Sequence, residues 1–262
     1  MTHETAPSYD FDAVIIGAGV LGGAIAVELA RRGLRTLNVD KAPTAGAGST
    51  SNSCAIVRFS YSTVPGVSLA WEAMHYWTDW PAYIGTDDEL GLITFNRCGQ
   101  FNLLVGGDDH SATVRALWEQ LGIPFEEWTL DDLTQRMPVL DHGLYGPPKR
   151  PDDPHFWDDA HGTVIGALFS PDSGYVSDPQ LSCHNLQRAA EAAGGEFWFN
   201  AEVISVNRAE DRVSGVTLAD GRRVAAPIVV NVAGPHSAVI NRMAGVHDSM
   251  NIKTRALRHE VH

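Results

Sequence analysis

The chain has 262 residues, of which 44% are hydrophobic, and a formal net charge of −13. This length allows one large domain or two smaller ones. The acidic balance argues against a nucleic-acid partner and against electrostatic binding to anionic membranes, and no apolar run is long enough for a membrane span. Three widely spaced cysteines form no C-x-x-C pair, which fits a reducing compartment, so we expect a cytoplasmic protein.

The most informative segment is an apolar, β-branched run over 11–16 that stops at a glycine-rich turn and continues as an apolar-periodic stretch. The turn reads G-x-G-x-x-G, with its glycines at Gly17, Gly19 and Gly22. A second strand is predicted over 35–39, and it ends at Asp40, where a ribose-binding acid is expected. Strand, turn, helix, strand and acid in this order predict a dinucleotide site with its phosphates at the helix N-terminus, rather than an ordinary glycine-rich loop.

The middle of the chain mixes helical and strand patterns. Small polar residues over 43–53 suggest either a linker or, directly after Asp40, a cofactor-facing loop. A helix is predicted over 65–80, with an aromatic and apolar stripe that we assign to the core rather than to a stacking platform: Leu69, Ala73, Tyr76, Trp77 and Trp80. Further on we predict strands over 92–104, helices over 111–121 and 130–137, a surface loop over 141–159 and a strand over 167–175.

The last third has clear boundaries. Asp178 is a good N-cap and Pro179 suits the first helical position, while Gly194-Gly195 ends that helix. Three strands are predicted next, over 202–207, 212–218 and 223–226, with a hairpin turn at Asp220-Gly221. A buried strand then runs over 228–234, and a strand is expected to begin near Thr254.

The order of these parts resembles the FAD-dependent D-amino-acid-oxidase-like amine oxidoreductases, a family that includes sarcosine oxidase, glycine oxidase and dimethylglycine dehydrogenase. The resemblance covers nearly the whole chain. It rests on the glycine motif with Asp40, the loop from Gly48 to Arg58, the three-strand meander after a long helix, and Asn231-Val232-Ala233-Gly234-Pro235.

The resemblance implies an α/β fold in which a Rossmann-like, discontinuous FAD-binding domain carries an inserted α+β substrate domain. The expected FAD-binding parts are residues 10–90 and 173–240. The substrate domain would occupy 91–172 and begin again over 241–262, where it is incomplete at the C-terminus.

The resemblance also implies the cofactor contacts. The pyrophosphate would lie on the three glycines, the adenosine ribose against Asp40 with Lys41 beside it, and the ribityl chain and ring near the loop. The implied cofactor-binding residues are Gly17, Gly19, Gly22, Asp40, Lys41, Ser49, Thr50, Ser51, Asn52, Val203, Ala233 and Gly234. Among these, Val203 matches a main-chain position that contacts adenine.

Two departures from the family pattern stand out. Some relatives carry a loop histidine bonded covalently to the flavin, but Ser51 and Asn52 stand there, so FAD is expected to bind non-covalently. Relatives also continue well beyond the position of His262. Either a second polypeptide supplies the missing part, or the chain is a fragment.

Arg58 is the strongest candidate for substrate binding. In the sarcosine oxidase branch an arginine at the matching position holds the substrate carboxylate, and a planar guanidinium suits that bidentate contact. A structural or surface arginine is the alternative. Tyr61 is either part of the same pocket or a packing residue. Cys54 is taken as a small packing residue rather than a nucleophile.

We predict no metal site. The terminal residues His259, Glu260 and His262 lack the H-E-x-x-H spacing of a zinc helix.

These features predict a FAD-dependent oxidoreductase that oxidises the C–N bond of an amino acid or N-methylated amino acid by hydride transfer to flavin. The alternative is a non-catalytic FAD-binding subunit or fragment that needs a partner chain. A nicotinamide-dependent dehydrogenase is a third reading, against which the small-residue loop after Asp40 and the late meander argue.

Overall fold

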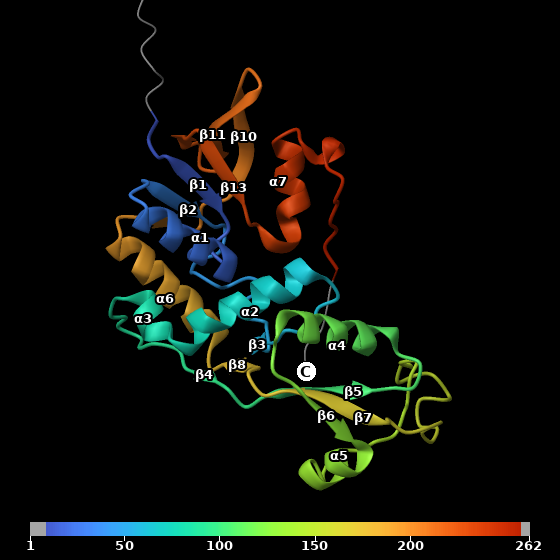
Figure 1. Cartoon of the computed structure of the whole chain (residues 1–262). Coiled ribbons are helices and arrows are strands. Elements are labelled where there is room, and N and C mark those ends of the chain that lie inside the picture. Colours follow the sequence, from blue (N-terminus) through green and yellow to red (C-terminus); the bar gives the residue numbers. More distant parts are fainter. Residues whose placement is uncertain (1–8, 258–262) are drawn as a thin grey trace, which may run out of the picture. The chain divides into compact units, whose positions relative to one another are not determined.

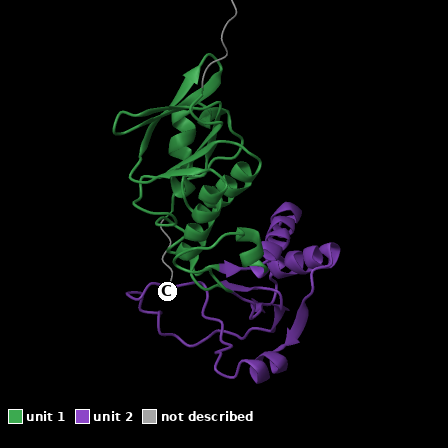
Figure 2. Ribbon diagram, turned by 90° about the vertical axis from the view of Figure 1, so that its left-hand side faces the viewer, with its two compact units in different colours: residues 1–55, 79–94, 176–262 green, residues 56–78, 95–175 purple. Residues whose placement is uncertain are grey.

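The computed structural model describes residues 9–257, and the chain divides into two compact units (Figure 2). Unit 1 contains the chain up to residue 55, residues 79–94 and the chain from residue 176 onward. Unit 2 contains residues 56–78 and 95–175. Residues 56–78 therefore pack with unit 2, although the sequence placed them in the first FAD-binding part.

Unit 1 is built on a four-stranded parallel sheet in the order β13-β1-β2-β9. Its strands are β1 Ala13–Ile16, β2 Thr36–Val39, β9 Glu196–Trp198 and β13 Ile228–Asn231. The register pairs Ile16 with Val39 on one side and with Asn231 on the other. Because the strands are parallel, the residues that follow β1, β2 and β13 meet at one edge of the sheet, where α/β folds bind ligands.

Two long helices lie together in unit 1: α1 Val20–Arg31 and α6 Pro179–Ala192 (Figure 1). Their close packing uses Gly23, where a Cβ would lie 2.9 Å from the Cβ of Leu186. The N-terminal signals predicted for α6 are confirmed, since Asp178 accepts the Leu181 N–H and Pro179 is the first helical residue. The remaining unit 1 helices are α3 Trp80–Ile84, α7 Ser237–Met243 and the 3-10 turns η1 Gly234–His236 and η2 His247–Ser249.

An antiparallel meander follows α6 and β9. It consists of β10 Val203–Ala209, β11 Arg212–Leu218 and β12 Arg223–Ala225, as the sequence predicted. Its apolar face shares one core cluster with β1 and β2, in which Val14, Leu37 and Val216 are fully buried. This packing places the start of β10 near the end of β2.

Unit 2 contains the antiparallel sheet β5-β7-β6, formed by β5 Gln100–Leu104, β6 Glu126–Thr129 and β7 Gly166–Ser170. A small sheet, β3-β8-β4, comprises β3 Ile56–Val57, β8 Gly174–Val176 and β4 Phe95–Asn96. The helices are α2 Val64–Thr78, α4 Asp109–Leu121 and α5 Leu130–Arg136. A core cluster centred on Trp118 and Phe59 joins α2 and α4, and the Trp118 indole donates to the Phe59 carbonyl.

Several sequence expectations are corrected by the structure. The apolar stripe assigned to the core is mostly not buried: Leu69 is 73% exposed and Tyr76 47%, because α2 packs through Val67 and Met74 instead. Trp80 is buried, but it begins the separate helix α3.

One further expectation fails: Cys54 is exposed and so is not a packing residue. Residues 255–257 form no strand, and the rest of the strand expected near Thr254 lies outside the described residues. Strands β6 and β9 were not foreseen. No helix among residues 9–257 is long and apolar enough to cross a membrane, and the terminal His259, Glu260 and His262 lie outside the described residues.

Candidate cofactor site

The glycine turn after β1 has a geometry that only glycine tolerates at two positions. Gly17 has φ +118°, and a Cβ there would lie 2.4 Å from the Val232 carbonyl oxygen. At Gly22 a Cβ would lie 1.8 Å from the carbonyl oxygen of Gly17 itself. The turn is therefore packed tightly between the start of α1 and the end of β13. Because its glycines have no side chains, a ligand can approach the main chain of the turn closely.

The N-terminus of α1 presents main-chain donors. Gly19 is the N-cap, and because glycine has no side chain, no side chain of the N-cap residue caps the helix. Among the described residues, the N–H groups of Gly19, Leu21 and Gly22 have no hydrogen-bond partner. Free N–H groups together with the positive end of the helix dipole form a site for a phosphate group.

Asp40 connects the ends of two strands through its carboxylate. One oxygen accepts the Ala18 N–H at 2.8 Å, and the other accepts the Ala42 N–H at 2.8 Å. Each carboxylate oxygen has a further lone pair, so Asp40 can still accept ribose hydroxyl groups. Lys41 beside it is exposed. The residues therefore fit a dinucleotide, with an anion cradle at the turn and an acid at the end of the next strand.

The small-residue loop after Asp40 folds over the same turn. Gly46 donates its N–H to the Ala18 carbonyl at 2.9 Å, and Thr50 accepts the Val20 N–H through its hydroxyl at 3.2 Å. The side chains of Ser51 and Asn52 instead donate hydrogen bonds to the Gly48 carbonyl. Ser49 is exposed. Of the loop residues predicted to face the cofactor, Thr50 is the one that the structure brings to the helix N-terminus.

The remaining predicted residues reach this region from the second half of the chain. The Ala201 N–H donates to the Asp40 carbonyl at 2.8 Å, which places Val203, two residues later, beside the end of β2. Ala233 and Gly234 directly follow Val232, whose carbonyl covers Gly17. The structure thus brings the three glycines, Asp40, Thr50, Val203, Ala233 and Gly234 to one sheet edge, whereas no contact places Lys41, Ser49, Ser51 or Asn52 there.

Arg58 and Tyr61 belong to unit 2. The Arg58 guanidinium lies over the Tyr61 ring, 5.4 Å from its centroid, and donates to the Ser60 hydroxyl at 3.1 Å. In the described part of the chain no carboxylate lies within ion-pair distance of Arg58. The arginine is exposed to solvent, whereas its neighbour Phe59 is buried. Its fork of donors is therefore available to an anion.

Polar side chains also gather at two other places in the described chain. Asp88, Glu89 and His184 bring potential ligand atoms within 4.8 Å of one another. However, Asp88 accepts from His184 at 2.8 Å and from Asn185, and Glu89 is bonded to Arg188. These groups satisfy each other, and we assign no metal to them.

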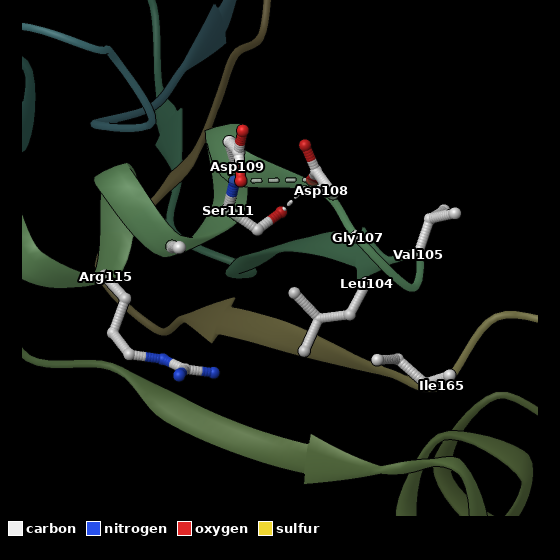
Figure 3. Close-up of a pocket in the computed structure, with 9 residues that line it drawn as sticks. Leu104, Val105, Gly107, Asp108, Asp109, Ser111, Arg115 and Ile165 are labelled. Carbon is white, nitrogen blue, oxygen red and sulfur yellow. Dashed lines mark hydrogen bonds between the residues drawn. The ribbon is translucent and has the colours of Figure 1, made fainter.

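The second grouping is a pocket in unit 2 where α4 begins (Figure 3). Its lining residues are Leu104, Val105, Gly107, Asp108, Asp109, Ser111, Ala112, Arg115 and Ile165. Asp108 is engaged as the N-cap of α4, and Arg115 pairs with Glu127. None of the predicted site residues lines this pocket.

One contact of the cofactor loop was missed from the sequence. Cys183 on α6 is 1% exposed, and the backbone of Gly46 lies against it. Burial raises the pKa of the Cys183 thiol to about 11, against smaller opposing effects of the Thr50 and Ser182 hydroxyls. Nothing in the spacing of the sequence connects residue 183 with residues 46 and 50.

The parallel sheet, the glycine turn and the acid after β2 define a dinucleotide-binding fold of the Rossmann type. The chain belongs to the family described as FAD dependent oxidoreductase (DAO), whose model matches residues 12–261. The expected family and its fold are thereby confirmed.

Curated relatives include N-methyl-L-tryptophan oxidase from Yersinia pestis and from Yersinia pseudotuberculosis. Each is 28% identical over 226 residues, which are 84% of this chain and 53% of the relative. The chain spans about half the length of the curated relatives it matches.

Solved structures agree in fold. L-proline dehydrogenase from P. horikoshii matches with a TM-score of 0.72 and 23% identity, over 92% of this chain and 57% of that one. Glycine oxidase from Geobacillus kaustophilus matches with a TM-score of 0.69 and 23% identity, over 91% and 59%.

Proposed function

We propose that this chain carries the FAD site and part of the substrate site of an oxidoreductase acting on the C–N bond of an amino acid or N-methylated amino acid. The observation that carries the proposal is the sheet edge where the glycine turn, Asp40 and the segment before β10 meet, in a chain of a FAD-dependent family. FAD bound there would supply a hydride acceptor for the carbon next to the amine nitrogen, so that the C–N bond would be oxidised to an imine that water hydrolyses.

The residues of unit 1 would bind and orient the cofactor. The free N–H groups of Gly19, Leu21 and Gly22 would donate hydrogen bonds to the pyrophosphate oxygens. Asp40 would accept the ribose hydroxyls while it keeps the Ala18 N–H in place. Val203 would meet the adenine through its main chain, and Ala233 and Gly234 would line the side of the cofactor away from the loop.

In unit 2, Arg58 would bind the substrate carboxylate. Its guanidinium has no carboxylate partner among the described residues and is held against the Tyr61 ring. A charge-assisted, two-point contact would fix the orientation of an amino acid, and Tyr61 would form the adjoining wall. N-methylated amino acids are included because a curated relative is named for N-methyl-L-tryptophan.

FAD attachment is proposed to be non-covalent. Ser51 and Asn52 occupy the loop position that carries a histidine in some relatives, and their side chains bond to the Gly48 carbonyl. Acid precipitation of the loaded protein should leave the yellow colour in the supernatant. Colour that stays with the precipitate would contradict this attachment.

The experiment that tests the function is an anaerobic titration. The purified chain is loaded with FAD, its visible spectrum is recorded, and a panel of amino acids and N-methyl amino acids is added without oxygen. Bleaching of the flavin band by an amine is the expected result. A flavin that stays oxidised with every amine, also after a completing chain is added, would contradict the oxidoreductase.

A second candidate function is a FAD-binding part that requires a second polypeptide. Two observations favour it: the matched region covers only 53% of the relative, and among residues 9–257 no further strand pairs with the outer side of β13 in the parallel sheet. The Val232 N–H donates to the Ile16 carbonyl. Because successive residues of a strand direct their N–H and C=O groups to alternate sides, Val229 and Asn231 direct theirs away from β1. An edge strand presents unpaired main-chain N–H and C=O groups with which a further strand can pair.

The two candidates separate in one assay. We expect the isolated 262-residue chain to show weak or no turnover and reduced FAD retention, since a site of this type must exclude water and orient its substrate. Co-expression with a chain that supplies the remaining part of the family fold should restore both. Robust turnover by a monomer of the isolated chain would contradict the requirement for a second polypeptide.

A further inference from the structure

The cofactor loop of unit 1 is held between two surfaces. On one side the Gly46 N–H donates to the Ala18 carbonyl of the glycine turn at 2.9 Å. On the other side Gly46 lies directly on helix α6: a Cβ added there would be 3.0 Å from the Cβ and 3.1 Å from the Sγ of Cys183. The loop therefore cannot shift toward α6 without colliding with this cysteine.

Thr50 lies four residues further along the same loop and reaches the start of α1. Its hydroxyl accepts the Val20 N–H at 3.2 Å, and a Cβ added to Gly19 would meet the same oxygen at 3.2 Å. The hydroxyl thus lies beside the free N–H groups of the helix N-terminus. The bond from Val20 uses a lone pair of the hydroxyl oxygen. The hydroxyl proton is not used in that bond and can be donated to a phosphate oxygen.

Cys183, whose side chain is 1% exposed, lies against Gly46. The Gly46 carbonyl in turn accepts the N–H of Ser51, the residue after Thr50, so the contact with Cys183 is passed to the Thr50 end of the loop. The thiol stays protonated at neutral pH because burial raises its pKa to about 11. A buried, protonated cysteine behaves as a small apolar residue with weak hydrogen-bonding ability, so its effect on the loop is one of contact.

We infer that Cys183 is a positioning residue, which holds Thr50 over the N-terminus of α1 and so shapes the phosphate-binding side of the cofactor site without touching the cofactor. This inference rests on the proposed function for the identity of the ligand. The geometry of the contact, however, belongs to the free protein and can be tested there.

The first arm measures hydrogen exchange of the Val20 amide by NMR in the full-length chain without flavin. Thr50→Val removes the acceptor, and exchange should become faster by about three- to tenfold, the equivalent of one neutral hydrogen bond. Cys183→Ala should speed exchange in the same direction, and Cys183→Ser, which keeps an atom at the γ position that contacts Gly46, should restore the wild-type rate. Cys98→Ala in unit 2, an exposed cysteine, is the matched control and should leave the rate unchanged.

The double variant Thr50→Val/Cys183→Ala decides whether Cys183 acts through Thr50. We expect it to exchange at the rate of Thr50→Val alone, because a residue that works through another has no effect once that residue is lost. Additive effects, or a Cys183→Ala variant with the wild-type rate, would overturn the inference. The melting temperature of each free variant shows whether a change extends beyond the loop.

The second arm repeats the series with FAD, measuring the dissociation constant by flavin fluorescence. Cys183→Ala should weaken binding by about three- to tenfold, with rescue by serine and no further loss in the double variant. If the wild-type chain binds no FAD, the proposed function fails, while the exchange rates still decide the role of Cys183. If FAD binds and Cys183→Ala has the wild-type affinity, the positioning role fails and the proposed function stands.

Discussion

The cofactor region of unit 1 and the Arg58 region of unit 2 satisfy their polar groups in opposite ways. Around Asp40, one carboxylate oxygen accepts the N–H of Ala42, two residues away, but the other accepts the N–H of Ala18, and the main-chain carbonyl accepts the N–H of Ala201; both of these partners are distant in the sequence. Around Arg58, the contacts come from Ser60 and Tyr61, two and three residues away.

The two regions are therefore held in place by different means. The cofactor region is preorganised by long-range main-chain bonds, so its geometry depends on the whole sheet of unit 1. The Arg58 region is organised locally, and its charge is uncompensated by any carboxylate in the described chain. Changes in the first region should therefore alter folding and binding together, whereas changes at Arg58 should alter substrate binding alone.

The largest effect is expected from Gly22→Ala. Its Cβ would be placed 1.8 Å from the Gly17 carbonyl oxygen, which is main chain and cannot rotate away. We expect a loss of unfolding free energy of more than about 3 kcal/mol and loss of FAD binding, since core overpacking of this kind is among the most damaging changes. Thermal unfolding and flavin content measure both.

Gly48→Ala is the matched control, because a Cβ there meets nothing within 4 Å. It should leave stability and flavin content close to wild type. A Gly22→Ala variant as stable as Gly48→Ala would show that the turn can accommodate a Cβ at position 22 and is not tightly held.

Asp40→Ala should have the next largest effect. It removes the acceptor of the Ala18 and Ala42 N–H groups, and two partly buried donors left without partners should cost about 2–4 kcal/mol of unfolding free energy. FAD affinity should fall as well. Asp220→Ala, which removes an exposed hairpin acid, is the control for loss of a carboxylate. Wild-type stability together with unchanged FAD affinity would remove Asp40 from the site.

Arg58→Met tests the local region. In the complete enzyme it should lower kcat/KM by about tenfold to several hundredfold, the equivalent of about 1.5–3 kcal/mol of charge-assisted bonding. Flavin content and melting temperature should remain near wild type, because Arg58 forms no ion pair in the described chain. Arg58→Lys should recover part of the loss, since it keeps the charge but not the fork. Unchanged kinetics, or loss of flavin, would contradict the assignment.

The smallest effect concerns a side-chain cluster of unit 1. Hydrogen bonding to Arg188 lowers the pKa of Glu89 to about 2 from its usual 4.5. A carboxyl whose pKa is depressed by folding contributes stability above its unfolded pKa, and this contribution is lost as the pH falls from about 4.5 toward 2. The melting temperature should fall over that range, and Glu89→Gln should reduce the slope slightly, since the pair is exposed. An identical slope in Glu89→Gln would assign the acid sensitivity to other carboxyls.

Local signals in the sequence were sufficient for most elements. The glycine turn, the Asp178 cap with Pro179, and the Asp220-Gly221 hairpin each act within a few residues, so their outcome does not depend on the rest of the fold. The same holds for the order of strand, turn, helix and acid, from which the dinucleotide-binding fold could be predicted. The cofactor residues named from the sequence remain predictions, which the structure brings together but which binding experiments must test.

What the sequence did not determine depends on contacts between distant segments. Short strands such as β6 and β9 carry little periodicity and exist because a neighbouring strand pairs with them, whereas no strand pairs with residues 255–257. The buried face of α2 and the packing of residues 56–78 into unit 2 were likewise decided by which surfaces were available to cover. The contact of Cys183 with Gly46 spans 137 positions, and only the tertiary structure reveals it, because burial and proximity are properties of the folded chain rather than of any local pattern.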